Sequence, residues 1–172
     1  MNYKTSLHTI KLFAFDYDGV FSGGTILLMP DGAQVRTASV RDGFAVQWAV
    51  KQGLELALVT GGKEEAVKTR LGKLGVQHLH LGASDKLAVV TELVERLGLK
   101  MEEVAYMGDD MPDVPVLERV GLAACPQDAV PEVRQICHYI SPFAGGAGCV
   151  RDLLEQAMKL RGLWDQQGGH HW

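Results

Sequence analysis

Two clusters of aspartates carry the residue types best able to do chemistry in this chain. The first cluster holds Asp16 and Asp18, and the second holds Asp109, Asp110 and Asp113. Each cluster follows a short apolar run with the composition of a strand buried on both faces. Carboxylates gathered at strand ends repel one another and lose hydration unless a divalent cation offsets their charge, and such oxygen ligands suit Mg²⁺. The sequence therefore predicts a magnesium site.

The spacing of the first cluster suits phosphoryl transfer. Side chains two residues apart lie on the same side of an extended chain, so Asp16 and Asp18 can face one substrate. Asp16 fits the nucleophile, which would form a transient aspartyl phosphate. Asp18 fits the acid that protonates the leaving oxygen and later deprotonates the attacking water. Gly19 allows the sharp turn that brings both carboxylates onto one phosphate.

Groups that bind an anion follow two other strand-like runs. Thr60 offers a hydroxyl, and the amides of Gly61 and Gly62 offer donors at the start of a helix. Lys86 supplies a positive charge against the charge that builds on the phosphoryl oxygens. Together with the nucleophile and the acid, Thr60 and Lys86 complete the expected catalytic set.

The predicted metal ligands come from both aspartate clusters. They are Asp16, Asp18, Asp109 and Asp110, the last bound directly or through a water molecule. Asp113 is expected to brace the second loop, although an aspartate near a helix start is often only a cap. Mg²⁺ is the one cofactor that this set predicts.

The elements that must position these groups alternate between strand-like and helix-like patterns, which predicts an α/β fold with a three-layer, Rossmann-like parallel sheet. The expected strands cover residues 12–15, 54–59, 79–81, 104–107, 122–124 and 139–140. The expected helices lie near residues 63–74, 85–97, 113–120, 130–135 and 150–160. Four glycines follow helical stretches, where a left-handed cap is expected: Gly53, Gly75, Gly98 and Gly121. Ligands bind beyond the carboxyl ends of such strands, so the polar groups should converge.

One segment departs from the alternation. Residues 25–29 and 33–37 flank Pro30-Asp31-Gly32, which predicts a β-hairpin flap over about residues 22–40. The interval between Asp18 and Thr60 is too short for an inserted cap domain, which needs roughly 50 residues. We expect one domain over residues 1–164, without a large cap, and a flexible tail over residues 165–172.

Composition excludes several classes of protein. The 172 residues are 47% hydrophobic and carry a net charge of −4, which suits a globular domain and gives no basic field for nucleic acid. No segment approaches the roughly 20 apolar residues of a membrane span, and the N-terminal region lacks the apolar stretch of a signal peptide. The three cysteines cannot all pair within one chain. A cytoplasmic enzyme that binds a small molecule is expected.

The order Asp-x-Asp-Gly-Val, Thr-Gly, a lone Lys and Gly-Asp-Asp-x-x-Asp resembles the haloacid dehalogenase (HAD) superfamily of phosphatases. The hairpin and residues 40–43, 106–110 and 145–148 resemble its cap-less 3-deoxy-D-manno-octulosonate 8-phosphate (KDO 8-phosphate) phosphatase family. The resemblance implies Mg²⁺-dependent hydrolysis of KDO 8-phosphate in lipopolysaccharide sugar biosynthesis. It also implies a homotetramer in which the hairpins assemble and neighbouring chains close the active sites.

Some positions differ from the family pattern and concern specificity. Gly62 stands where family members often carry a side chain that touches the sugar, and Lys63 is a candidate to replace it. Ala147 replaces a frequent arginine, and Tyr17 replaces a smaller apolar residue. Arg41 and Asp42 are either substrate contacts or an exposed ion and a helix cap.

Other functions remain open at this stage. The nearest alternative substrate is the 9-phosphate of a nine-carbon keto-sugar acid of the sialic-acid type. A non-catalytic partner module with the same fold is a second alternative, but the complete acid set argues against it. A phospho-acceptor domain of the response-regulator kind gives no reason for two carboxylates at a spacing of two.

Overall fold

A computed structural model describes residues 3–164, and the predicted tail, residues 165–172, lies outside them. A six-stranded sheet forms its centre, with the strand order β5-β4-β1-β6-β7-β8 and parallel pairing throughout. The strands are β1 (Leu12–Phe15), β4 (Glu55–Val59), β5 (His78–His80), β6 (Val104–Met107), β7 (Leu122–Cys125) and β8 (Tyr139–Ile140). The predicted α/β fold is confirmed, and residues 3–164 contain no large cap domain.

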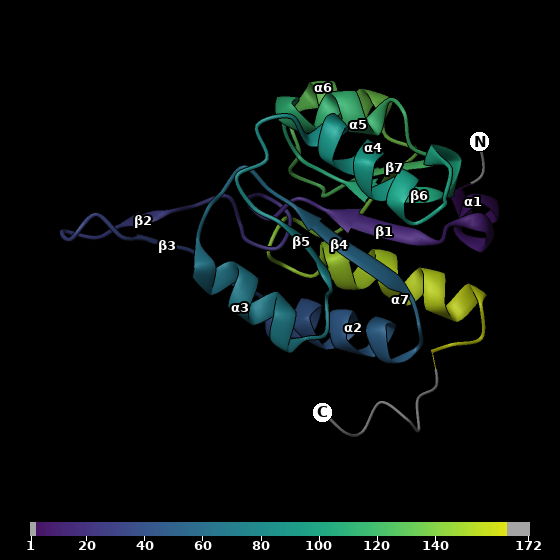
Figure 1. Cartoon of the computed structure of the whole chain (residues 1–172), viewed down its shortest axis with the longest axis horizontal. Coiled ribbons are helices and arrows are strands. Elements are labelled where there is room, and N and C mark those ends of the chain that lie inside the picture. The colour runs from purple at the N-terminus through teal and green to yellow at the C-terminus, as the bar shows by residue number, and fades with distance from the viewer. Residues whose placement is uncertain (1–2, 165–172) are drawn as a thin grey trace.

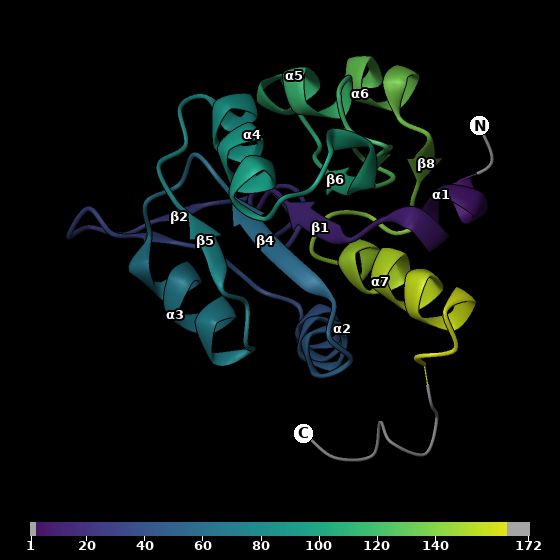
Figure 2. The same ribbon diagram turned by 45° about the vertical axis from the view of Figure 1, so that its right-hand side comes forward.

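Helices cover both faces of the sheet (Figures 1 and 2). One layer holds α2 (Val40–Lys51), α3 (Glu65–Lys73) and α7 (Cys149–Leu160), and the other holds α4 (Lys86–Arg96), α5 (Val114–Leu117) and α6 (Pro131–Ile136). The shorter elements are α1 (Tyr3–Thr9) and the 3₁₀ helices η1 (Met101–Glu103) and η2 (Met111–Asp113). In β1, Phe13 and Phe15 belong to the core under α2 and α7, whereas Leu12 and Ala14 belong to the core under α4 and α5. This two-sided burial explains the continuous apolar run.

The pairing of β1 with its neighbours brings the two aspartate clusters together. Phe15 lies opposite Met107 of β6 and opposite Leu58 of β4. The amide of Asp16 then donates a hydrogen bond of 3.0 Å to the carbonyl of Met107. The chain segments that follow β1, β4 and β6 therefore leave the sheet at one edge, where parallel strands of this kind place their ligands.

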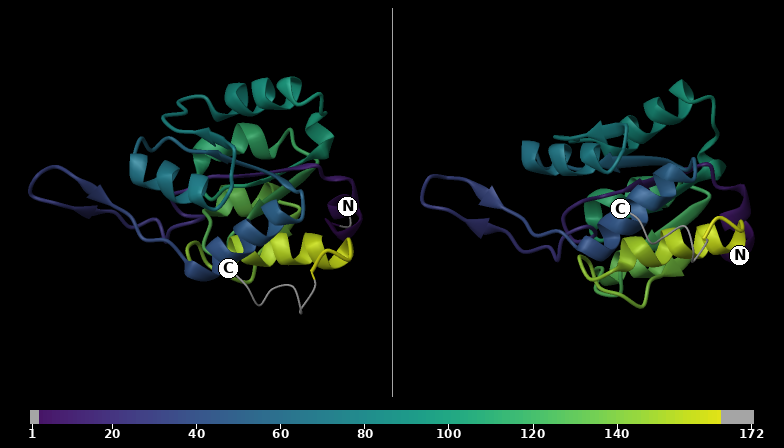
Figure 3. Two further views of the ribbon diagram at one scale, coloured as in Figure 1. Left: turned by 60° about the horizontal axis from the view of Figure 1, so that its bottom comes forward. Right: turned by 90° about the horizontal axis from the view of Figure 1, so that it is seen from below.

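The predicted hairpin projects away from the body of the molecule in every view (Figure 3). Its strands, β2 (Leu27–Leu28) and β3 (Gln34–Val35), pair antiparallel and form a sheet of their own. Met29 and Ala33 close the turn through an N–H···O bond of 2.9 Å. The apolar side chains of the hairpin remain in solvent, and Leu28 is 78% exposed.

Three of the four predicted glycine caps are confirmed and one is wrong. Gly53, Gly75 and Gly98 have φ values of +80°, +95° and +65°. Gly121 is absent from the positive-φ residues, so it is no left-handed cap. A Cβ at Gly121 would lie 1.9 Å from the carbonyl oxygen of Glu102, so close backbone packing requires glycine there.

No helix between residues 3 and 164 is both long enough and apolar enough to cross a membrane.

Candidate active site

Asp16 and Lys86 form the centre of the site. The Lys86 ammonium lies 2.7 Å from Asp16 Oδ2 and 2.7 Å from Asp113 Oδ1. Lys86 is the first residue of α4, and Asp85 caps that helix by accepting a hydrogen bond of 3.0 Å from the amide of Ala88. The helix start therefore fixes the direction in which Lys86 reaches toward the end of β1.

Asp113 braces this arrangement and is completely buried. Its Oδ1 accepts a hydrogen bond of 2.7 Å from the Tyr106 hydroxyl in addition to the contact with Lys86. Its Oδ2 accepts from the amides of Asp109 and Asp110 at 3.1 and 3.3 Å. Both oxygens are thus occupied, so Asp113 holds the second aspartate loop and the lysine in place.

Asp109 can approach Asp16 because residue 19 is a glycine, which has no side chain. Gly19 has a φ of +83°, and a Cβ there would lie 1.9 Å from Asp109 Oδ2. Any other residue at position 19 would therefore push Asp109 away from the first aspartate loop. Asp16, Asp109 and Asp113 each offer one carboxylate oxygen, and these oxygens lie within 4.8 Å of one another.

Burial and the repulsion between neighbouring carboxylates disfavour the charged forms of Asp16 and Asp109. Burial, followed by the charges of Asp113, Asp16 and Asp110, raises the pKa of Asp109 to about 7. Burial and then the charge of Asp113 raise the pKa of Asp16 to about 6, although Lys86 opposes the shift. For Lys86, burial favours a lower pKa, but the two adjacent aspartates outweigh it and raise the pKa above its ordinary value.

The carboxylates of this group fit a divalent cation. Lys86 does not offset all of the negative charge, and within residues 3–164 the Asp109 carboxylate has no hydrogen-bond donor of its own. Among these residues Asp113 accepts four hydrogen bonds, whereas each oxygen of Asp16 has one donor, Tyr17 N–H or Lys86. Asp16 and Asp109 therefore keep lone pairs that are able to hold Mg²⁺.

The other two predicted ligands, Asp18 and Asp110, lie beside this group. Asp18 and Asp110 line a cleft of about 470 Å³, which Asp16 and Asp109 also line. The Asp18 carboxylate is paired with Arg36, and Asp110 Oδ1 accepts a hydrogen bond of 2.7 Å from the amide of Met111 at the start of η2. Direct binding of the metal by Asp18 and Asp110 stays a prediction.

The predicted phosphate-binding groups line this cleft as well. Thr60, Gly61 and Gly62 follow β4 directly and face it together with Lys86. Thr60 is only 3% exposed, and its hydroxyl accepts a hydrogen bond of 3.2 Å from the amide of Gly62. The structure thus brings all four catalytic candidates to one cleft.

Two substrate-contact candidates, Arg41 and Asp42, do not line this cleft. Asp42 is completely buried, and its Oδ1 accepts a hydrogen bond of 2.8 Å from the amide of Arg151 in the first turn of α7. It does not cap its own helix, because the cap of α2 is Ser39. Arg41 lines a separate pocket beside α7. Asp42 is therefore a structural link between α2 and α7, which pack against each other.

Lys63 also lies outside the residues that line the cleft. Its side chain packs along Gly82, where a Cβ would lie 3.4 Å from Lys63 Cε. A contact between Lys63 and the sugar stays a prediction.

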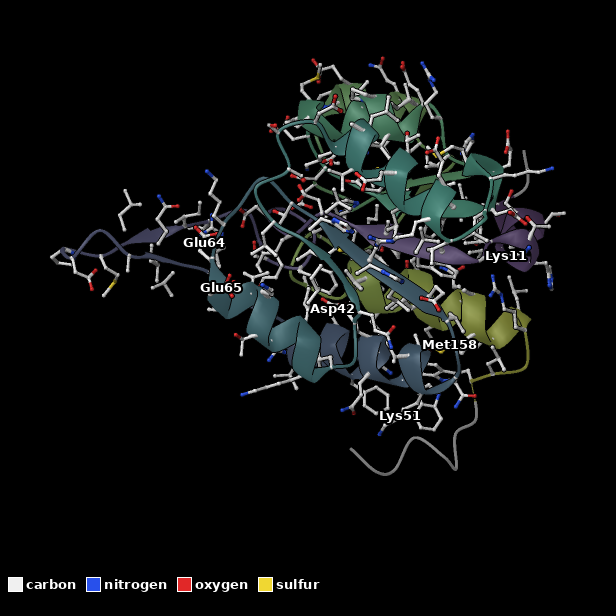
Figure 4. All side chains as sticks on the ribbon, in the orientation of Figure 1. Lys11, Asp42, Lys51, Glu64, Glu65 and Met158 are labelled. Atoms are coloured by element: carbon white, nitrogen blue, oxygen red, sulfur yellow. The ribbon has the colours of Figure 1, made fainter. Side chains whose placement is uncertain are left out.

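Sequence reasoning missed two polar residues beside the cleft, Arg36 and Glu64. Arg36 Nε lies 2.8 and 3.0 Å from the two oxygens of Asp18, and its Nη1 lies 2.9 Å from Glu64 Oε1. Glu64 sits where the hairpin meets the start of α3 (Figure 4). Neither residue belongs to a recognisable motif, so no local signal marks them.

The raised pKa values predict that stabilisation by Mg²⁺ depends on pH. The ordinary pKa of an aspartate is near 4, so the folded chain without metal holds extra protons between about pH 4 and pH 7 and loses stability as pH rises through that window. Mg²⁺ requires ionised carboxylates. We expect the increase in melting temperature on adding Mg²⁺ to be larger at pH 8 than at pH 5.

Thermal unfolding with and without Mg²⁺ at both pH values tests this expectation. Asp109→Asn is the matched variant, because it keeps the size of the side chain and removes a ligand charge, and it should lose most of the shift. An equal shift at pH 5 and pH 8 in the unaltered chain would contradict a site built on Asp16 and Asp109.

Comparisons with known proteins agree with this geometry. Residues 78–151 match the haloacid dehalogenase-like hydrolases, which is the class that the sheet and its carboxylates define. A 3-deoxy-D-manno-octulosonate 8-phosphate phosphatase of Salmonella typhi is 37% identical over 165 residues, which cover 96% of this chain and 88% of the relative. The chain therefore belongs to the KDO 8-phosphate phosphatase family of these hydrolases and is a phosphoric monoester hydrolase.

Two solved structures of this family are similar to the whole described fold. The phosphatase of Yersinia pestis has a TM-score of 0.91 at 33% identity and covers 94% of this chain and 88% of its own. The phosphatase of Moraxella catarrhalis, in complex with a magnesium ion, a phosphate ion and KDO, has a TM-score of 0.89 at 33% identity. The match covers 93% of this chain and 92% of that one.

Proposed function

We propose that this chain hydrolyses 3-deoxy-D-manno-octulosonate 8-phosphate to KDO and phosphate, in the pathway that supplies a lipopolysaccharide sugar. The observation that carries the proposal is the buried carboxylate of Asp16, which lies 2.7 Å from Lys86 and faces Asp109 at the end of a central strand. The complex of the Moraxella relative with magnesium, phosphate and KDO supports the choice of substrate and cofactor.

The first half of the reaction transfers the phosphoryl group to the protein. One oxygen of Asp16 attacks phosphorus, while the bond between phosphorus and the C8 oxygen of the sugar breaks. Asp18 donates a proton to that leaving oxygen, so KDO departs as a neutral alcohol at C8. Lys86 orients Asp16 and offsets charge on the phosphoryl oxygens, which the hydroxyl of Thr60 and the amides after it can bind.

The second half returns the protein to its starting state. Asp18, now ionised, takes a proton from a water molecule as that water attacks phosphorus. The bond between phosphorus and Asp16 breaks, and the products are inorganic phosphate and a free carboxylate. Mg²⁺ would be held by Asp16 and Asp109, with Asp18 and Asp110 as further candidate ligands, and would offset the negative charge on the phosphoryl oxygens.

A comparison of two substrates tests the proposed specificity. Specificity constants are measured in Mg²⁺ for KDO 8-phosphate and for the 9-phosphate of a nine-carbon keto-sugar acid. We expect KDO 8-phosphate to be preferred. A preference of tenfold or more for the nine-carbon compound would assign the chain to the related activity.

We also propose that the chain works as a homotetramer in the cytoplasm. The hairpin exposes Leu27, Leu28 and Val35 at 57%, 78% and 43%, and an apolar surface of this kind is typical of a contact between subunits. All three cysteines of the chain are free thiols, as is usual in a reducing compartment.

Charges placed on the hairpin should separate the subunits. The double variant Leu27→Lys and Leu28→Lys is expected to lower the molar mass in solution, because it would bury two unpaired ammonium groups at the contact. Light scattering after size exclusion measures the mass, with Ile140→Lys, 40% exposed on the edge strand β8, as the control. An unaltered mass in the double variant would place the subunit contact elsewhere.

A further inference from the structure

The guanidinium of Arg36 is buried at the base of a hairpin that is otherwise exposed. Arg36 follows β3, and its side chain is 6% exposed, whereas Leu28 on the paired strand is 78% exposed. It contacts Asp18 from the loop after β1 and Glu64 at the start of α3. Arg36 thus joins the hairpin to the two loops that carry the acid Asp18 and the phosphate-binding glycines.

Gly62 leaves the space that this contact needs. A Cβ at position 62 would lie 2.8 Å from Glu64 Oε2 and 3.8 Å from Arg36 Nη2. A side chain there would therefore displace the Glu64 carboxylate and would lie in van der Waals contact with the guanidinium. The open space at position 62 is therefore bordered by the Glu64 carboxylate and by the Arg36 guanidinium.

Arg36 is paired with the carboxylates of Asp18 and Glu64, but one of its donor atoms is still available to an anion that replaces one of them. The ammonium of Lys86 is taken by Asp16 and Asp113. Nη2 of Arg36 has no hydrogen-bond partner within residues 3–164, while Nε and Nη1 are engaged. The proposed substrate carries a carboxylate besides its phosphate, and a guanidinium binds a carboxylate through two parallel hydrogen bonds.

The contact with Asp18 conflicts with the role of that residue in the reaction. Both oxygens of Asp18 accept a hydrogen bond from Arg36 Nε, at 2.8 and 3.0 Å. An acid that serves the leaving oxygen must turn toward the substrate, so the Arg36 contact has to open before the reaction proceeds. An anion that competes for the guanidinium would open it.

We propose that Arg36 determines specificity by binding the carboxylate of the sugar acid and, in the same movement, releasing Asp18 to face the leaving oxygen. This inference rests on the proposed function and names the group that recognises the acid. A phosphate ester that lacks a carboxylate leaves Asp18 held by Arg36, so it is turned over slowly even though its phosphate fits the cleft.

The test compares two phosphate esters in wild type and in Arg36→Met. KDO 8-phosphate bears the carboxylate, and arabinose 5-phosphate is a pentose phosphate without it. For Arg36→Met we expect kcat/KM on KDO 8-phosphate to fall about 10- to 100-fold, the effect of losing charged hydrogen bonds. The kcat on arabinose 5-phosphate should stay level or rise, because Asp18 is no longer paired with Arg36 and, in the described part of the chain, keeps only the hydrogen bond from the Ser22 hydroxyl.

Two further variants separate recognition from structure. Arg36→Lys keeps the charge without the planar fork. Its ratio of the two specificity constants should therefore lie between those of wild type and Arg36→Met. If Arg36→Met does not fold, the ratio of Arg36→Lys tests the inference in its place. Arg70→Met is the control, because Arg70 donates to the carbonyl of Ser39 at 3.4 Å and has no contact with Asp18. Its ratio should equal that of wild type.

Equal losses on both esters in the Arg36 variants, or no loss on either, would overturn the inference. The result is distinguishable from failure of the proposed function, which would appear as negligible hydrolysis of KDO 8-phosphate by wild type. In that case the same ratio is measured with the nine-carbon acid 9-phosphate, which also bears a carboxylate.

Discussion

Asp16→Asn is expected to lower kcat for phosphate release by at least about 10⁴-fold, because an amide cannot form the aspartyl phosphate. The measurement is inorganic phosphate released from KDO 8-phosphate in Mg²⁺. Asp31→Asn is the matched control: Asp31 lies in the exposed hairpin turn, where its Oδ1 accepts a hydrogen bond of 3.0 Å from the amide of Ala33. Release by Asp16→Asn at the rate of the control would remove Asp16 as the nucleophile.

The same variant should remain folded, which separates lost chemistry from lost structure. The raised pKa of Asp16, caused first by burial, means that its charge is unfavourable in the chain without metal. Removing that charge should leave the melting temperature in chelator at pH 8 equal to or above that of wild type. A large decrease would show that the Asp16 to Lys86 ion pair stabilises the fold more than the burial of Asp16 destabilises it.

Removal of divalent cations is expected to abolish turnover, and added Mg²⁺ should restore it. Asp16 and Asp109 lie close together with pKa values of about 6 and 7, so without a cation they repel each other and an incoming phosphate dianion. Phosphate release is measured in excess chelator, in chelator already saturated with Mg²⁺, and after Mg²⁺ is added back. Turnover that persists in excess chelator would contradict the metal requirement.

The strands and most helices were predictable because their signals are local. The runs at residues 104–107 and 139–140 match β6 and β8 in full, and the helix expected near residues 85–97 corresponds to α4. Strands buried on both faces need continuous apolar residues, and the catalytic aspartates stand directly after them. Sequence order and strand polarity were therefore enough to place the chemistry at one edge of the sheet.

Other helices were less well predicted. The short helix α1 went unrecognised because polar residues interrupt its apolar pattern. The helix expected near residues 113–120 is shorter: α5 ends at Leu117 and begins directly after η2, a 3₁₀ turn that Asp110 caps. Such details depend on capping contacts that composition does not reveal.

Hydrogen bonds made by side chains outside the expected catalytic set were the least predictable. Tyr106 reads as a core residue of a buried strand, yet its hydroxyl donates to Asp113 and fixes a carboxylate of the site. Asp42 reads as a cap of its own helix, yet it accepts from the amide of Arg151. Neither contact leaves a periodic trace in the sequence, whether the partners are 7 residues apart or 109, so only the folded arrangement identifies them.

The central claim is that the two aspartate loops hold one metal ion and one phosphorus atom at Asp16. A crystal structure grown with Mg²⁺ and beryllofluoride, a mimic of the aspartyl phosphate, tests it most directly. We predict the beryllium bonded to a carboxylate oxygen of Asp16, with Mg²⁺ bound by Asp16 and Asp109 and Lys86 beside the fluorides. An adduct on another residue, or a metal ion that contacts neither aspartate, would contradict the account.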